Sequence, residues 1–500
     1  MRLFKILFVF IFLGFIFWGC GGGGGSDGDG FIPTGNIIAV AERSGSNVPI
    51  KVGGTTGAVP PGSTVQVTNL DTGETQTTTA EADGSFDPTF IGNTNDTFEV
   101  IVSNGNSTVT DIIGVTLISQ AATRGLAVLG SVPTAIEILG NRAYVVNGGF
   151  NNIQIFDLDQ NPPQEIPTIV LPPGSDPVAI AFIDNTRAYV ANLTGQSVAI
   201  VNVQTMQCER LIVRSDKPPS NTSACQNQVT TVDPEFFEEP SDITIANGKV
   251  YVANSNLDDF FQPQGNGFIT VIDSETNQVS GNIIEASGTN SSGITLINGK
   301  LYVVNRGNTF FDIDTGNFTC DFGLPPSIDV ISPQSDTILD TIDISLIPQN
   351  PLVCSPTRLE QTPDGKFAYM GLGLVGALLK VDLENNMIVN GPDNPIIITD
   401  LSGLNFTADV EIRSDGLGFI TLFNTDQIAV FDTNNDEVDP FPFIAPFPAG
   451  LRADNPNSQL FDGVQSIAIR SDGEFPDIFF ITGLSSKLGS VNTALILPPE

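Results

Sequence analysis

One short motif recurs along the chain and limits the possible folds more than any other feature. A tyrosine, a valine, an alanine or valine, and an asparagine follow one another at residues 144–147, 189–192, 251–254 and 302–305, and Tyr369 begins a degenerate copy. Each copy is preceded by an alternation of apolar and polar residues and by a turn, a pattern that predicts paired antiparallel strands. Because one supersecondary unit repeats, the sequence predicts a fold in which equivalent units stand side by side.

Seven alternating segments of this kind can be counted. They lie at residues 135–138, 179–182, 242–245, 293–296, 358–360, 409–412 and 466–469. A third strand follows most of them and often ends on an acidic turn, as at Asp157 and Asp273. Four-stranded units repeated around a channel are the blades of a propeller, so residues 124–500 are predicted to form an all-β, seven-bladed β-propeller. Residues 126–129 precede the first repeat without a partner, and we expect them to add the outer strand of the last blade.

The motif resembles the YVTN-type (YncE-like) repeat of bacterial and archaeal cell-surface and periplasmic propellers, with Ala or Val in place of Thr. The resemblance covers most of residues 124–500 and implies a fold more firmly than a reaction. Proteins with this repeat include surface-layer and binding proteins, and neighbouring propeller families include lactone hydrolases. We expect the motif asparagines to cap the turns that leave their strands, with ligand contact at the channel mouth as the alternative. These asparagines are Asn147, Asn192, Asn254 and Asn305.

The N-terminus has the order of an export signal. Two basic residues precede an apolar run at residues 6–18 that is too short for a comfortable membrane span. The Gly-Cys pair that follows resembles a bacterial lipobox, although two aromatic residues stand where that family has Leu and a small residue. The resemblance implies a lipoprotein signal peptide at 1–19 and lipidation of Cys20. Because Asp does not directly follow Cys20, the outer membrane is favoured in a host that has one, and the composition of residues 20–35 predicts a Gly-rich tether. A plain signal peptide and an uncleaved anchor are the alternatives.

A small domain is predicted between the tether and the propeller, over residues 36–115. Turns at 59–63 and 71–73 separate short alternating segments, and residues 83–86 read Asp-Gly-Ser-Phe. The segment resembles bacterial Ig-like domains, which implies a β-sandwich acting as a spacer or an adhesive module.

Cysteine usage agrees with an exported protein. Apart from Cys20 the chain has four cysteines, and none of them has the CxxC spacing of a zinc or redox site. Four cysteines allow three pairings, of which we favour Cys208 with Cys225 and Cys320 with Cys354, each bridging loops. Reduced, buried thiols are the alternative.

Charge and composition exclude several functions. The chain has 20 basic and 56 acidic residues, a net charge of −36, which would repel a nucleic-acid backbone. It has no histidine, which removes Ser-His-Asp and Cys-His catalysis and most zinc and copper sites. We therefore predict no catalytic residue, no metal site and no cofactor. Calcium at the acidic turns 312–317 or 432–437 is the alternative.

The long insertions point to a binding surface. They fall in loops that follow the second strand of a blade or join two blades, and such loops emerge on one face. Three insertions carry a pair of phenylalanines beside carboxylates. We expect these pairs to be exposed for binding, while the alternative is that each pins its own loop to the ring. The pairs are Phe236 with Phe237, Phe260 with Phe261, and Phe310 with Phe311.

Two functions remain. The first is a non-catalytic, monomeric envelope lipoprotein that binds an envelope protein or polysaccharide and touches the membrane only through its lipid anchor. The second is a calcium-dependent, lactonase-like hydrolase acting at the channel mouth. Three or more oxygen ligands gathered at that mouth would distinguish the second from the first.

Overall fold

The computed structural model describes residues 37–491 apart from internal segments, the longest of which are 42–47, 118–122, 347–353, 399–405, 445–462 and 471–476. Nearly all regular structure in the described part is β, and the exceptions are the single 3-10 turns η1 (Ser223–Cys225) and η2 (Pro234–Phe236). The expected all-β class is therefore confirmed for these residues. Within them, no helix has the length and apolar character needed to cross a membrane.

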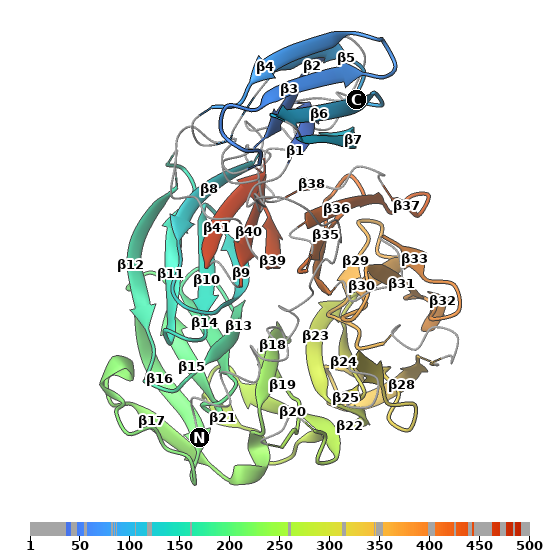
Figure 1. Cartoon of the computed structure of the whole chain (residues 1–500). Helices are drawn as coiled ribbons and strands as arrows, with labels where there is room; N and C mark the ends of the chain where they lie inside the picture. Colours follow the sequence, from blue (N-terminus) through green and yellow to red (C-terminus); the bar gives the residue numbers. More distant parts are fainter. Residues whose placement is uncertain are drawn as a thin grey trace.

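The first seven strands form a separate unit above the rest of the chain (Figure 1). Their order in the sheet is β4-β3-β6-β7-β1-β2-β5. Strand β7 pairs with β6 through residues 107–114 and, in parallel, with β1 through residues 115–117, so the sheet changes partner along one strand. The bounds are β1 (Ile37–Ala41), β2 (Val48–Gly54), β3 (Thr64–Asn69), β4 (Thr75–Thr79), β5 (Thr89–Gly92), β6 (Thr97–Asn104) and β7 (Ser107–Leu117).

The core of this unit comes from both halves of that sheet. Side chains of β3 and β6 alternate between buried and more exposed positions, as strands with one covered face do. Val65 and Val100 from one half join Ile50, Val52 and Phe90 from the other in one buried cluster. The unit is thus two layers around a single core, to which β3, β5 and β6 contribute by two-residue alternation.

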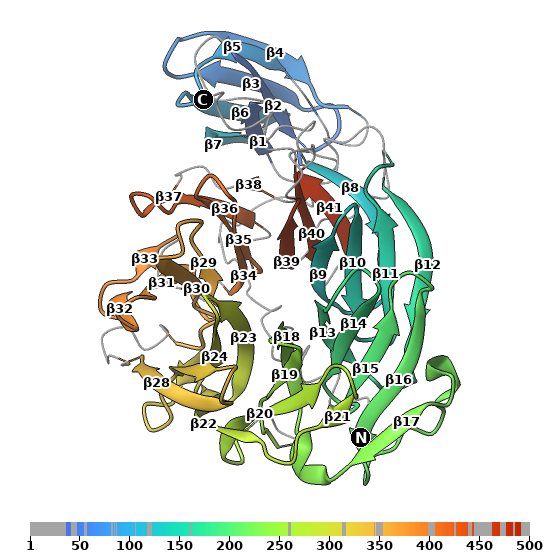
Figure 2. The same cartoon turned by 180° about the vertical axis from the view of Figure 1, so that it is seen from behind.

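Further sheets follow one another in a ring (Figures 1 and 2). The first contains β9 (Pro133–Leu139), β10 (Arg142–Asn147), β11 (Asn152–Asp157) and β12 (Gln164–Val170). The second contains β13 (Pro177–Phe182), β14 (Arg187–Asn192), β15 (Ser197–Asn202), β16 (Gln207–Arg214) and β17 (Val229–Val232). The third contains β18 (Pro240–Ala246), β19 (Lys249–Asn254), β20 (Asn266–Asp273), β21 (Gln278–Val279) and β22 (Ile284–Thr289).

The next sheets continue the ring. The fourth contains β23 (Ser291–Ile297), β24 (Lys300–Asn305), β27 (Ser327–Ser332) and β28 (Thr337–Asp343), with the hairpin β25 (Thr309–Asp312) and β26 (Asn317–Cys320) inserted. The fifth contains β29 (Glu360–Gln361), β30 (Phe367–Gly371), β31 (Ala377–Asp382), β32 (Met387–Asn390) and β33 (Ile396–Ile397). The sixth contains β34 (Thr407–Ile412), β35 (Leu417–Leu422), β36 (Gln427–Asp432), β37 (Glu437–Val438) and β38 (Phe443–Ile444).

The last sheet joins the two ends of the ring. It contains β39 (Val464–Ile469), β40 (Ile478–Thr482), β41 (Lys487–Val491) and β8 (Thr123–Val128). Strand β8 pairs antiparallel with β41, Thr123 opposite Val491 and Val128 opposite Lys487. The outer strand of the last sheet therefore comes from the segment before the first repeat, as the sequence predicted. The edges of β8 and β41 that face each other are both paired.

The tyrosine of the repeated motif links several sheets to the next one. Tyr189 donates its hydroxyl proton to Asn277 at 2.7 Å and Tyr251 donates to Asp336 at 2.7 Å, in each case across a sheet boundary. Tyr369 donates to Asp436 in the same way. These acceptors occupy turn positions with φ between 54° and 61°, which Asn and Asp tolerate better than most residues. The motif thus specifies contacts between repeats as well as strands within them.

The asparagine of the motif is buried inside its own sheet. Asn254 donates to Thr270 at 3.0 Å, Asn192 donates to Ser197 at 3.0 Å, and Asn305 donates to Ser327 at 3.1 Å. Each acceptor lies on the third strand, beyond the turn that the asparagine precedes. This arrangement fits the expected structural role at the turn, because fully buried side chains cannot meet a ligand.

Candidate functional site

The inner strands of the ring place charged side chains at one level of the channel. Asp242 and Asp409 are the third residues of β18 and β34, and Arg358 holds the corresponding place just before β29. The equivalent residues of β9 and β13 are Ala135 and Ala179. Because side chains repeat every two residues on one face of a strand, the next inward level contains Glu137, Glu360 and Glu411.

A cavity of about 130 Å³ lies at this level. Its walls include Glu137, Asp242, Arg358 and Asp409, and the small residues of β9 and β13 leave room opposite the arginine. Nearly all lining residues stand near the beginning of an inner strand. The cavity therefore lies at the end of the channel where chains return from the outer strands, which is the face that carries the long insertions.

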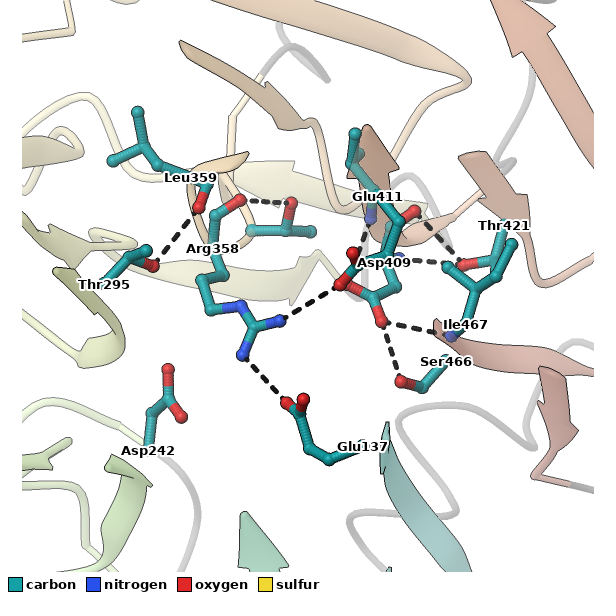
Figure 3. Close-up of polar contacts among 12 residues, drawn as sticks. Glu137, Asp242, Thr295, Arg358, Leu359, Asp409, Glu411, Thr421, Ser466 and Ile467 are labelled. Carbon is teal, nitrogen blue, oxygen red and sulfur yellow. Dashed lines mark hydrogen bonds and ion pairs between the residues drawn. The ribbon is translucent and has the colours of Figure 1, made fainter. Parts of the chain in front are cut away.

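Arg358 connects three sheets across the channel (Figure 3). Its Nη1 lies 3.4 Å from Oε1 of Glu137 in the first sheet, and its Nη2 lies 3.5 Å from Oε1 of Glu411 in the sixth. About a third of the Arg358 side chain is exposed, facing the cavity that it lines. The guanidinium thus forms part of the cavity wall, and its ion pairs join the fifth sheet to the first and the sixth.

Asp242 and Asp409 play equivalent structural roles. Asp242 accepts a hydrogen bond from the backbone N–H of Ile294 in the next sheet at 2.9 Å. Asp409 accepts from the hydroxyl of Ser466 at 2.7 Å and from the N–H of Ile467 at 3.2 Å, again in the next sheet (Figure 3). Each carboxylate satisfies a backbone donor at a sheet boundary, which accounts for its position without a ligand.

Burial and mutual repulsion raise the pKa values of the carboxyl groups in this cluster. Burial raises the pKa of Glu137, of Asp242 and, to about 7, of Glu360. Burial, with repulsion from Glu360 and Asp409, holds the pKa of Glu411 well above its usual value. Burial alone would lower the pKa of Arg358, but attraction to the surrounding carboxylates outweighs burial and raises this pKa well above its usual value. The cluster can therefore exchange protons near neutral pH and form hydrogen bonds with a polar ligand.

The described residues do not assemble the ligand set of a metal enzyme. No three Asp, Glu or Cys side chains within the described ranges converge as a metal site. In the turn 432–437, Asp432 accepts from the backbone N–H of Asn434 at 2.8 Å, so this carboxylate closes its own turn. The other candidate turn, 312–317, falls largely outside the described residues.

Long insertions are joined to one another on the cavity face. The structure pairs Cys208 with Cys225 and Cys320 with Cys354, the pairing favoured from the sequence. The expectation that both bonds bridge loops is wrong for Cys208, which lies on strand β16, so the first disulfide ties the insertion after β16 back to its own sheet. The second disulfide joins the β25–β26 hairpin to the connection before β29. Cys320 and Cys354 pack with Leu374, Phe406 and Phe423 in a buried cluster that includes residues near β34 and β35. Connections from several sheets thus pack into one layer, and a disulfide joins two of them.

The phenylalanine pairs do not form one exposed surface. Phe237 is fully buried between the second and third sheets, so its predicted exposure is wrong, and it pins its own loop. The reason is that η2 turns the chain inward just before β18 begins. Phe236 is half-buried beside it, whereas Phe310 is 38% exposed on the hairpin. Phe311 pairs through its backbone with Phe318, while Phe260, Phe261 and Cys20 lie outside the described residues.

Sequence reasoning missed the charged cavity. Its signal was present in the inner strands, where Asp242, Arg358 and Asp409 occupy positions that face the channel. Charged residues at alternate positions of otherwise apolar strands are uncommon inside proteins, and they mark a polar interior. Only the ring geometry brings these separate strands together.

The chain has no match among protein-family models or among curated proteins. Solved structures do resemble it. Catalytically inactive virginiamycin B lyase from Staphylococcus aureus, in a structure with quinupristin, is 14% identical, with a TM-score of 0.50 over 74% of this chain and 98% of that one. Hydrazine synthase from Kuenenia stuttgartiensis is 16% identical, with a TM-score of 0.49 over 73% and 96%. A β-propeller domain from Myceliophteria thermophila is 8% identical, with a TM-score of 0.48 over 74% and 99%. At such identities the likeness concerns the fold alone, which is a β-propeller.

Proposed function

We propose that this chain is a non-catalytic, exported lipoprotein whose propeller binds an envelope protein or polysaccharide through its insertion face. The observation that carries the proposal is the layer of connections held by Cys320 and Cys354 over several sheets. Insertions that only lengthened loops would not need a shared core or a covalent link. A fixed layer beside a polar cavity is suited to recognition, because preorganised loops lose less entropy when they bind.

The remaining features fit this proposal. Among the described residues after 122, seven sheets are present besides the inserted hairpin, which supports a seven-bladed ring. The two-layer unit at residues 37–117 has the size and strand pattern of an Ig-like stalk. Two disulfides favour an oxidising compartment, and the lipobox-like Cys20 would supply an anchor in the outer membrane. The channel carboxylates bond to Arg358 or to backbone donors, which favours binding over catalysis.

The proposal can be tested by trimming the hairpin. Residues 310–319 are replaced with a short Gly-Ser linker that leaves Cys320 in place, and binding to isolated envelope fractions is measured with the purified chain. Fractions treated with protease or with glycosidases identify which kind of partner is bound. The matched control is Leu339→Ser, because Leu339 is 56% exposed on β28, in the same sheet but outside the insertions.

We expect the trimmed chain to lose binding while the control retains it, with both melting near the wild type. Undiminished binding by the trimmed chain would rule out the hairpin as part of the binding face. Binding lost equally in Leu339→Ser would show that apolar exposure in general, rather than the insertion face, is responsible.

A further inference from the structure

Arg306 is a cation without a counter-ion. It directly follows the motif asparagine at the end of β24, on the insertion face. Its Nε is buried without a hydrogen-bond partner, and its side chain forms no ion pair with any described acid. Burial lowers its pKa, with no carboxylate opposing that effect. Arg214 and Arg470 are more deeply buried than the half-buried Arg306, and each of them is ion-paired. Burying a charged group costs free energy unless an opposite charge pairs with it. An anion from outside the described chain would supply that pair for Arg306.

A second donor without a partner stands close to Arg306. A Cβ on Gly373 would lie 2.9 Å from Nη2 of Arg306 and 3.3 Å from Oγ of Ser355. The Ser355 hydroxyl forms no hydrogen bond with the described residues. The surroundings of Gly373 are thus too close for a side chain, and its absence lets the guanidinium and the Ser355 hydroxyl stand near each other, where both can donate to the same group.

The position of Ser355 is fixed from two directions. Its carbonyl accepts from the N–H of Gly373 at 2.8 Å, and its neighbour Cys354 is bonded to Cys320. Its φ is 56°, in the left-handed region that costs a non-glycine residue energy. Strained residues persist where the surrounding structure holds them, and they are concentrated at binding sites.

The donors and the overall charge define the ligand. A guanidinium presents paired N–H groups that match the two oxygens of a carboxylate, and a hydroxyl can supply a third hydrogen bond. The net charge of −36 repels multiply charged anions more strongly than singly charged ones. We propose that Arg306 and Ser355 bind a carboxylate group carried by an otherwise uncharged ligand. This inference rests on the proposed binding function, and it names the chemical group that the insertion face recognises.

An acidic sugar and a peptide C-terminus both supply such a carboxylate. The full chain is titrated by calorimetry with glucuronate and with N-acetylalanine, and the neutral counterparts glucose and N-acetylalaninamide serve as ligand controls. The variants are Arg306→Gln, which removes the charge, and Ser355→Gly, which removes the hydroxyl and suits the left-handed φ. Arg142→Gln, at the start of β10, is the matched loss of one positive charge elsewhere.

We expect the wild type to bind at least one carboxylate and neither neutral analogue. Arg306→Gln should weaken binding by about tenfold or more and Ser355→Gly by about fivefold, because a hydrogen bond to a charged group contributes more than a neutral one. Without ligand, Arg306→Gln should melt no lower than the wild type, since it removes an unpaired buried charge. Glucuronate binding alone indicates an acidic sugar, and N-acetylalanine binding alone indicates a chain terminus; either supports the site.

Three results would overturn the inference: no carboxylate binding by the wild type, undiminished binding by Arg306→Gln, or a much lower melting temperature of Arg306→Gln, which would assign the side chain to structure. The proposed function is judged separately. A wild type that binds carboxylates but no envelope fraction contradicts the proposed function and leaves this site standing. An Arg306→Gln chain that loses carboxylates but keeps the envelope partner places the main contact elsewhere on the face.

Discussion

Phe237 offers the sharpest test of how the insertion between β17 and β18 is held. Its ring is fully buried among residues of two sheets, including Tyr189 and Ile212 of the second and Ile243 of the third. Phe237→Ala leaves a cavity that cannot close unless the two sheets move together. Phe-to-Ala changes in well-packed cores cost about 3–5 kcal/mol, so we expect a loss of about 4 kcal/mol. The hydrogen bond from Arg214 to the Phe237 carbonyl at 3.0 Å does not depend on the ring and should remain.

The assay is unfolding in denaturant and by heat, with Phe236→Ala as the control. For a ring of roughly 370 residues, an unfolding entropy of about 2.1 cal/mol/K per residue gives about 0.8 kcal/mol/K, so the melting temperature should fall by about 5 °C. Phe236 is only half-buried, and its replacement should cost about 1 kcal/mol. Equal losses for the two variants, or a loss below 1 kcal/mol for Phe237→Ala, would refute the view that this ring pins the insertion.

Further predictions address the anchor, the disulfides, the links between sheets and the channel. Cys20→Ser should move the protein from membranes to the soluble fraction, and unchanged fractionation would exclude lipidation. Mass mapping without reduction should recover Cys320 joined to Cys354, and free thiols at both would contradict the structure. Tyr251→Phe should cost about 1 kcal/mol in chemical unfolding through its lost hydrogen bond. Burial raises the pKa of Glu360 from 4.5 to about 7, so near neutral pH the folded state holds a proton that the unfolded chain releases. The free energy of unfolding should therefore fall as the pH rises from about 5 to 8. Glu360→Gln should make that fall smaller.

Local patterns in the sequence predicted the features that depend on neighbouring residues. The tyrosine motif and the alternations before it gave the strands, because a two-residue period decides which side of a strand is buried. The unpaired segment at 126–129 predicted the partner of β41, since an edge in a closed ring needs covering. The favoured pairing, Cys208 with Cys225 and Cys320 with Cys354, joins cysteines that are neighbours in the sequence, and both bonds are present.

Features that depend on several distant strands could not be predicted. Arg358 meets Glu137 and Glu411 only because three sheets point inward at one level, and no spacing in the chain encodes that distance. The phenylalanine pairs illustrate the same limit. Phe237 and Phe310 stand in similar acidic surroundings in the sequence, yet one is buried and the other is exposed, because only the first faces a gap between two sheets. No sequence pattern marks Arg306, because its lack of an ion pair depends on which acidic side chains the fold brings near it.

The pairing of β8 with β41 has a consequence for assembly. The two strands lie at opposite ends of the ring sequence, and each doubling of a loop adds about 0.6 kcal/mol to the entropy cost of closing it, so this pairing costs roughly 3 kcal/mol more than a ten-residue hairpin. During folding, a ring that is otherwise complete therefore has unpaired edges on β8 and β41. In that state β8 of one molecule can pair with β41 of another. Exchange between molecules depends on concentration whereas closure within one molecule does not, so crowding of newly made chains favours interlinked rings over single ones.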